Sequence, residues 1–368
     1  MKIEWIEFEN LSSGLKIKRV DFFEDITLLV GLSGSGKTQI LRAVKYIISL
    51  GVNKLTKLES CKASIGVLCN GHHYTWHVHI DKGTDDFTFE ETCRFYKEEL
   101  YCDTKLLLKR DNDDIFIEGY DRVPTPKTDE SLVLQYSAEP LIRGFILGIR
   151  AIRPVEVDIA VYGAIDSQQF LELREQVYNR INISKTPTIA QFQALPVIFK
   201  LHLAKSSFPD VYAKIFADVK DLFLEIEDLD VVEYIPANSY VIAMKVYGKW
   251  LYQHDISNGM LKSIHYIVEL YTTAPNSLVL IDEFENGLGV NCIDVLSDTL
   301  LNTRDDLQFI ITSHHPSIIN NIDSAQWRII ERDALEVSNF SDEDYGINHS
   351  MHDPFFNLIN RWKKEGRD

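Results

Sequence analysis

The sequence lacks the features of a secreted or membrane-embedded protein. Its five cysteines are an odd number and include no CxxC pair, so a disulfide framework is not expected. No apolar run approaches the roughly 20 residues that a membrane-spanning helix needs. The N-terminal stretch MKIEWIEFEN alternates like a strand and has no basic and then apolar segment, as a signal peptide would. These absences predict a cytoplasmic protein without a membrane partner.

Sustained heptads and an excess of positive charge are also missing. No heptad pattern is long enough for a coiled-coil arm. The chain has 38 Lys and Arg residues and 55 Asp and Glu residues, which gives a net charge of −17. Because such a chain repels a phosphate backbone on average, non-specific duplex binding is disfavoured, whereas a basic protein partner is compatible. A nucleic-acid partner would need a local basic spot such as Arg143, Arg150 and Arg153, for which a solvated face is the simpler interpretation.

Hydrophobic periodicity divides the chain into four segments and predicts an α/β fold. Residues 1–154 begin with alternating strands, a buried run ITLLV and a helical stretch TQILRAVKYIISL, and continue from 63 to 119 as an antiparallel meander. Residues 155–230 carry apolar residues at helical spacing, which predicts a compact helical insertion. Strands and helices alternate over residues 231–335, and residues 336–368 form a tail that ends in a helix.

The stretch GLSGSGKT, residues 31–38, fits G-x-x-x-x-G-K followed by Ser or Thr. A buried strand precedes it and a helix follows it, so backbone N–H groups and the helix N-terminus would surround phosphate oxygens. Lys37 would neutralise the phosphates and Thr38 would bind Mg²⁺. The alternative is a glycine-rich turn with a chance lysine. The residues expected at the phosphates are Gly31, Ser33, Gly34, Ser35, Gly36, Lys37 and Thr38.

The stretch SLVLIDEFENGL, residues 277–288, predicts a buried strand that ends in two acids. Since α/β sheets bind ligands at the carboxyl ends of their strands, Asp282 is expected at the metal. Glu283 would orient or deprotonate an attacking water. An ordinary strand that ends in solvated carboxylates is the alternative.

Two further stretches complete the pattern. LQFIITSHHP is another apolar strand, and the first histidine after it, His314, would contact the γ-phosphate unless it is a plain surface histidine. In DISNGMLKSIHYI, Ser257 and Gly259 begin an amphipathic helix. A serine and a glycine at a helix start make either an anion site or simply an N-cap.

The order and spacing of these motifs resemble the ABC-type ATPase heads of the SMC, RecF and OLD kind, and most closely the stand-alone bacterial AAA-family ATPases of anti-phage operons. In that pattern ISNGM matches the signature motif, LIDEFENGL matches Walker B with the D-loop, and TSHHP matches the switch-histidine segment. The resemblance covers about residues 1–50 and 230–335. It implies a P-loop ATPase head with an antiparallel β lobe, which uses ATP and Mg²⁺.

The resemblance also implies an ATP-dependent homodimer. Ser257 and Gly259 of one copy would contact the ATP held by the other, and Asn286 would lie in the D-loop at that interface. The chain departs from the pattern at Asn258, where the signature has Gly, and at Met260, where it has Gln. Gln135 is the candidate for the expected Q-loop glutamine.

Two segments found in the similar families are not seen in this sequence, and this narrows the expected function. SMC proteins carry long coiled coils and OLD nucleases continue into a Toprim nuclease domain, whereas this chain ends soon after the switch histidine. We therefore expect an ATP-driven switch that gates a separately encoded nuclease or toxin, with phage defence as the role that the resemblance implies. The alternatives are a RecF-like DNA-repair ATPase and an ATP-binding scaffold or sensor with negligible turnover.

Overall fold

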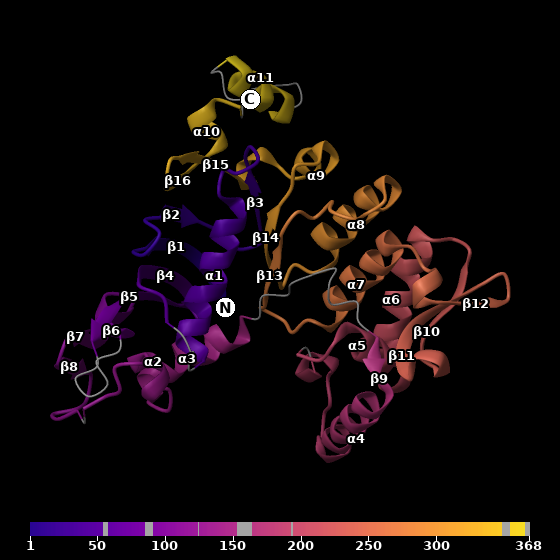
Figure 1. Cartoon of the computed structure of the whole chain (residues 1–368), viewed down its shortest axis with the longest axis horizontal. Helices are drawn as coiled ribbons and strands as arrows, with labels where there is room; N and C mark the ends of the chain where they lie inside the picture. The colour runs from indigo at the N-terminus through magenta and orange to yellow at the C-terminus, as the bar shows by residue number, and fades with distance from the viewer. Residues whose placement is uncertain are drawn as a thin grey trace. The chain divides into compact units, whose positions relative to one another are not determined.

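The computed structural model describes residues 1–53, 58–84, 91–123, 125–152, 164–192, 194–347 and 354–364 (Figure 1). Contacts divide the chain into two compact units. The first unit consists of Met1–Pro154, Asn276–Phe284 and Asp306–Asp368, and the second of Val155–Pro275 and Glu285–Asp305. Among the described residues, no helix is both long and apolar enough to span a membrane.

The first unit is built on a large mixed sheet. Its strand order is β13-β14-β3-β15-β16-β2-β1-β4-β5-β6-β7-β8. The strands are β1 (Lys2–Asn10), β2 (Lys16–Asp21), β3 (Ile26–Val30), β4 (Cys61–Cys69), β5 (His72–Thr84), β6 (Glu91–Cys102), β7 (Lys105–Asp111), β8 (Asp114–Ile117), β13 (Leu278–Ile281), β14 (Gln308–Thr312), β15 (Trp327–Asp333) and β16 (Glu336–Phe340). The helices are α1 (Lys37–Val52), α2 (Leu132–Gln135), α3 (Pro140–Ala151), α9 (Pro316–Asn321), α10 (Asp342–Tyr345) and α11 (Pro354–Lys364).

The predicted nucleotide-binding motifs lie in the parallel part of this sheet. β3 pairs in parallel with β14 on one side and with β15 on the other, and β14 pairs in parallel with β13. Each of β3, β13 and β14 is buried along its whole length, which is typical of parallel strands covered on both faces. Because parallel strands end at one edge, the loops after β13, β14 and β3 meet there.

The antiparallel part of the sheet forms the predicted meander. β4 to β8 pair in chain order, and the connections after β4 and β6 use Asn70 and Asp103 at positive φ (52° and 53°), a backbone conformation that Asn and Asp tolerate. Both α1 and α3 contact β4 and each other, and Figure 1 shows them side by side. Their apolar faces bury the inner face of the meander, including the fully buried Trp76. The sequence pattern had not identified α2 and α3 as helices.

The second unit is a helical layer on a small antiparallel sheet. Its strands are β9 (Ile165–Asp166), β10 (Ile226–Tyr234), β11 (Ser239–Val246) and β12 (Lys249–Tyr252). Its helices are α4 (Ser167–Ile183), α5 (Val197–Ser207), α6 (Pro209–Leu222), α7 (Asn258–Thr272) and α8 (Val290–Thr303). The predicted α4, α5 and α6 are present, although α6 ends at Leu222 and Ile226 already belongs to a strand, since it pairs with Val246.

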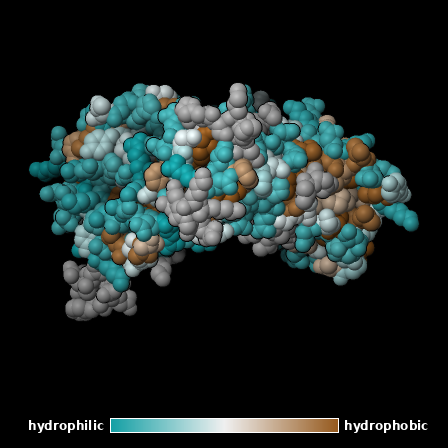
Figure 2. Space-filling view, turned by 90° about the horizontal axis from the view of Figure 1, so that it is seen from above, coloured by the Kyte–Doolittle hydropathy of each residue, from teal (hydrophilic) through white to brown (hydrophobic). Residues whose placement is uncertain are grey.

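This division of the chain differs from the segments expected from the sequence. Residues 231–275 and 285–305 cluster with the helical segment, whereas Asn276–Phe284 clusters with the N-terminal lobe. Of the arginines considered as a basic spot, Arg143 and Arg150 are exposed on α3, and Arg153 lies outside the described residues. In Figure 2 hydrophilic residues predominate over the visible face and separate apolar patches interrupt them.

Candidate functional site

The loop between β3 and α1 has the geometry that a phosphate-binding loop requires. Gly36, the residue before α1, has a φ of 104°, and a β carbon on it would lie 2.7 Å from Val337 Cγ2. A β carbon on Gly31 would lie 2.5 Å from the carbonyl oxygen of Ile330. Both positions therefore require glycine, and the loop leads into the N-terminus of α1, where free backbone N–H groups favour an anion.

Lys37 is held inside this loop. Its side chain is buried, with 6% of the residue exposed. Its Nζ donates to the carbonyl oxygens of Gly31 at 2.8 Å and Leu32 at 3.0 Å, and lies 3.5 Å from Ser35 Oγ. The loop thus positions one cation beside the N-terminus of α1, where two sources of positive potential favour an anion.

Three oxygen-bearing side chains meet at the carboxyl ends of β13 and β14 and the start of α1. Thr38 Oγ1 donates to Asp282 Oδ1 at 3.2 Å, and Thr312 Oγ1 donates to the same oxygen at 2.7 Å. Carboxylate and hydroxyl oxygens are the ligands that Mg²⁺ takes beside nucleotide phosphates, so Asp282 and Thr38 fit that ion. Thr312 is fully buried and fixes the orientation of the carboxylate.

Glu283 follows Asp282 in a rarely occupied backbone conformation. Its φ is 47°, which a non-glycine residue adopts only where the surroundings hold it. Its N–H donates to Thr312 Oγ1 at 2.7 Å, and the N–H of Phe284 donates to the carbonyl oxygen of Thr312 at 3.1 Å. Since Phe284 is buried, the turn is fixed on both sides and presents the exposed Glu283 side chain at the edge of the sheet.

A cavity of about 180 Å³ brings most of the predicted catalytic and phosphate-binding residues together. It is lined by Ser33, Gly34, Gly36, Lys37, Thr38, Gln39, Asp282, Glu283, Thr312, His314 and Arg332. His314 is exposed, whereas His315 is half-buried and accepts a hydrogen bond from the Ser317 N–H at the start of α9. Of the two histidines, the one preferred from the sequence therefore faces the cavity.

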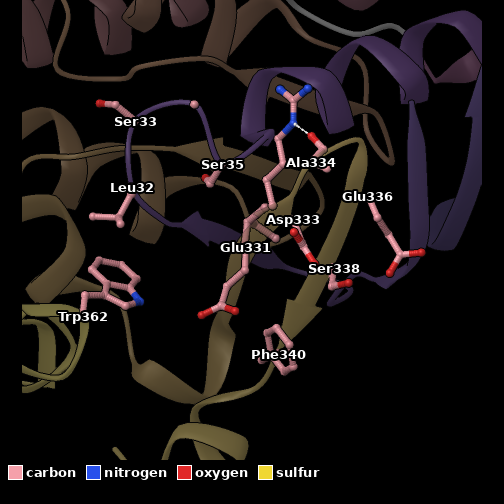
Figure 3. A pocket seen from close by; sticks show the side chains of 13 residues that line it. Leu32, Ser33, Ser35, Glu331, Asp333, Ala334, Glu336, Ser338, Phe340 and Trp362 are labelled. Atoms are coloured by element: carbon pink, nitrogen blue, oxygen red, sulfur yellow. Dashed lines mark hydrogen bonds between the residues drawn. The ribbon is translucent and has the colours of Figure 1, made fainter. Parts of the chain in front are cut away.

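A larger cavity of about 860 Å³ adjoins the P-loop on the side of β15 and β16 (Figure 3). Leu32, Ser33, Gly34 and Ser35 form one wall, and residues of β15 and β16 form another. Trp362 of the C-terminal helix α11 also lines it, and Figure 3 shows its ring next to Leu32. The predicted C-terminal helix therefore packs beside the nucleotide loop.

The signature and D-loop residues lie in the second unit and pack on each other there. Ser257 caps α7, since its side chain accepts a hydrogen bond from the Met260 N–H at 3.2 Å. A β carbon on Gly259 would lie 3.1 Å from the carbonyl oxygen of Gly287, so the D-loop backbone passes close to the helix start. The buried Lys262 Nζ donates to the carbonyl oxygen of Asn286. The exposed side chains of Ser257 and Asn286 are left at the surface of this unit.

Gln135 has a local role in the structure. Its carboxamide donates to the carbonyl oxygens of Lys127 at 2.9 Å and Glu130 at 2.8 Å, and accepts from the Lys127 N–H at 2.9 Å. It thus closes the loop before α2 and is not among the residues that line the 180 Å³ cavity. A contact between Gln135 and a nucleotide stays a prediction.

Comparison with solved structures identifies the architecture. The crystal structure of an SMC head bound to the C-winged helix domain of ScpA has a TM-score of 0.50 at 13% identity, and the match covers 94% of this chain and 100% of the other. The fold is that of an SMC ATPase head. SMC heads from Thermotoga maritima (TM-score 0.47, 13% identity, 93% and 99% covered) and Pyrococcus furiosus (0.48, 11%, 94% and 98%) are also similar.

A family model described as "AAA domain, putative AbiEii toxin, Type IV TA system" matches residues 171–320. The matched range contains the stretches predicted as signature, Walker B and switch-histidine segments, and begins after residues 31–38. A search of curated proteins found no match to the chain. The predicted α/β ATPase-head fold and the predicted resemblance are therefore confirmed.

Two residues that line the cavity, Thr312 and Arg332, had no predicted role. Thr312 stands in the TSHHP segment, two residues before His314, and had no assigned part in the site, yet its hydroxyl group donates to the Asp282 carboxylate and accepts from the Glu283 N–H. Arg332 lies at the end of β15, a strand that the sequence predicted without assigning it any part in the site. A polar residue that ends an otherwise apolar strand was the available signal for Thr312.

Proposed function

We propose that this protein is an ATPase that binds ATP between two copies and works as a switch. The observation that carries the proposal is the convergence of Lys37, Thr38, Asp282, Glu283 and His314 on one cavity of about 180 Å³. A P-loop alone binds many nucleotides, whereas a P-loop with a metal-binding acid, a second acid and a histidine at the same sheet edge supports hydrolysis.

Each residue of the cavity has a chemical part in this proposal. Lys37 and the N-terminus of α1 bind the phosphates, and Mg²⁺ held by Thr38 and Asp282 would neutralise the charge that develops on them. Glu283 accepts a proton from the attacking water or orients it. His314 donates a hydrogen bond to the γ-phosphate, so its position depends on whether ATP or ADP is bound.

The proposed dimer rests on residues that lie outside the 180 Å³ cavity. The signature residues Ser257 and Gly259 lie at the start of α7, and the exposed side chains of Ser257 and Asn258 leave this helix N-terminus available to a second copy. Helix N-termini bind phosphate readily. In this proposal Asn286, in the adjoining D-loop, lies at the same dimer interface.

The client of the switch is proposed to be a separately encoded protein in the cytoplasm. The description of the matching family names a putative toxin of a type IV TA system, and one similar SMC head is bound to a domain of another protein, ScpA. The first is in keeping with a toxin-related role in phage defence, and the second with a separate protein as the client. The net charge of −17 weighs against DNA as the main client.

The test is the native mass and ATP turnover of Glu283→Gln, purified with ATP from its own host cells. We expect negligible turnover, retained ATP and a dimer that carries a second protein. A dimer that carries DNA would support the repair alternative, and slow turnover in the wild type that no partner accelerates would support the scaffold alternative. Wild-type turnover by Glu283→Gln would exclude Glu283 as the base, and a monomer that ATP leaves unchanged would exclude the shared site.

A further inference from the structure

Arg332 is the one described cation besides Lys37 that lines the phosphate cavity. It also lines the adjoining cavity of about 860 Å³, together with Ser33 and Gly34 at the tip of the P-loop. The arginine therefore stands where the two cavities meet. Nothing in the motif pattern of the sequence assigns a role to this position.

The strand register directs Arg332 toward the P-loop. β15 pairs in parallel with β3, the strand that leads into the loop, and antiparallel with β16. In the hairpin Arg332 lies directly opposite Val337, and residues directly opposite each other share one face of the sheet. The buried Val337 packs on Gly36, so this face is the one that contacts the loop.

One N–H group of the Arg332 guanidinium is hydrogen-bonded within the chain, and the others can contact a ligand. Its Nε donates to the carbonyl oxygen of Ala334 at 2.8 Å, the hydrogen bond drawn as a dashed line in Figure 3. An arginine has five N–H donors, so the four on its terminal nitrogens can still bind an anion. Among the described residues, no carboxylate forms an ion pair with Arg332. The adjacent Glu331 extends away toward Phe340.

We propose that Arg332 binds the terminal phosphates of the nucleotide held in the P-loop of the same chain. This inference rests on the proposed ATPase function and adds a second phosphate-binding cation to it. Arg332 shares its cavity with Asp282, Glu283 and His314, which places it at the end of the nucleotide where hydrolysis occurs. The planar guanidinium fork binds two phosphate oxygens at once, which suits a γ-phosphate.

The test compares the affinities of wild type, Arg332→Ala and Arg332→Lys for fluorescent ATP and ADP analogues in the presence of Mg²⁺. We expect Arg332→Ala to weaken ATP binding by about 10- to 100-fold, the effect of one charge-assisted hydrogen-bonding group. The loss should be larger for ATP than for ADP. Arg332→Lys keeps the charge without the fork and should fall in between.

Arg19→Ala is the matched control, because Arg19 is an exposed arginine of the same unit that pairs with Asp21 outside the site. It removes the same charge and should leave ATP affinity unchanged. Equal ATP affinity in wild type and in folded Arg332→Ala or Arg332→Lys would overturn the inference, and so would an equal loss in Arg19→Ala. If wild type itself fails to bind ATP, the proposed function fails first and this inference fails with it.

Discussion

Replacement of Thr312 by valine tests whether its buried hydroxyl group organises Asp282 and Glu283, the acids of the proposed catalytic site. The hydroxyl group donates to Asp282 Oδ1 and accepts from the Glu283 N–H, each at 2.7 Å. Valine has nearly the same shape, so the packing of this fully buried position is retained. The lost hydrogen bond to a charged group contributes about 1.5–3 kcal/mol.

If that free energy serves to position the acids in the transition state, kcat should fall by about 10- to 100-fold, since 1.4 kcal/mol corresponds to a factor of ten. The KM for ATP should rise less than kcat falls, because Lys37 and the N-terminus of α1, which bind the phosphates in the proposed function, are untouched. Steady-state ATP hydrolysis measures both constants, and the melting temperature reports the fold.

Thr312→Ser is the control for this experiment. It keeps the hydroxyl group and should retain most of kcat, while the missing methyl group lowers stability by about 1 kcal/mol. A folded Thr312→Val protein with wild-type kcat would refute the argument. A lower melting temperature with unchanged kcat would show that the two hydrogen bonds only stabilise the fold.

Three further predictions concern nucleotide binding and stability. Gly36→Ala should abolish ATP binding in a chain that still folds, as a nucleotide titration and circular dichroism would show, because its φ of 104° and the close approach of β16 exclude a β carbon. Lys262→Met should lower the free energy of unfolding by about 1–3 kcal/mol, and Lys262→Arg by less, since the buried ammonium group binds the Asn286 carbonyl oxygen. Burial and two lysine cations lower the pKa of His265 to about 3. As the pH falls, the unfolded chain therefore protonates His265 before the folded chain does, and the free energy of unfolding should decrease between about pH 6.5 and pH 3. In His265→Gln this decrease should be smaller, as acid-unfolding curves would show.

Local sequence patterns predicted the part of the site that depends on single strand–loop–helix transitions. The glycine pattern of residues 31–38 and the apolar runs before Asp282 and His314 each specify a strand and the polar residue at its end. Because parallel strands end at the same edge, these patterns together predicted that the residues would converge. The structure places most of them, including Lys37, Asp282 and His314, around one cavity.

The remaining features depend on contacts between distant parts of the chain. Arg332 faces the P-loop only because β15 pairs with β3, almost 300 residues earlier in the sequence. The strand at Ile226 was predicted as helix, since its apolar spacing continues that of α6 and only its pairing with β11 determines the outcome. Likewise α7 and β13 are neighbours in sequence but belong to different compact units.

The distribution of charge in the cavity bears on how an acidic protein would bind a polyanion in the proposed function. The chain carries a net charge of −17, yet the cavity combines Lys37 and Arg332 with Asp282 and Glu283, so that its own side chains sum to 2 − 2 = 0. Attraction for a triphosphate must then come from the N-terminus of α1 and from the Mg²⁺ that Asp282 is suited to hold. In the proposed function the two carboxylates would repel a bare nucleotide and accept one that carries its metal. The same balance makes each of the two cations important, because removal of either leaves the cavity with a net negative charge.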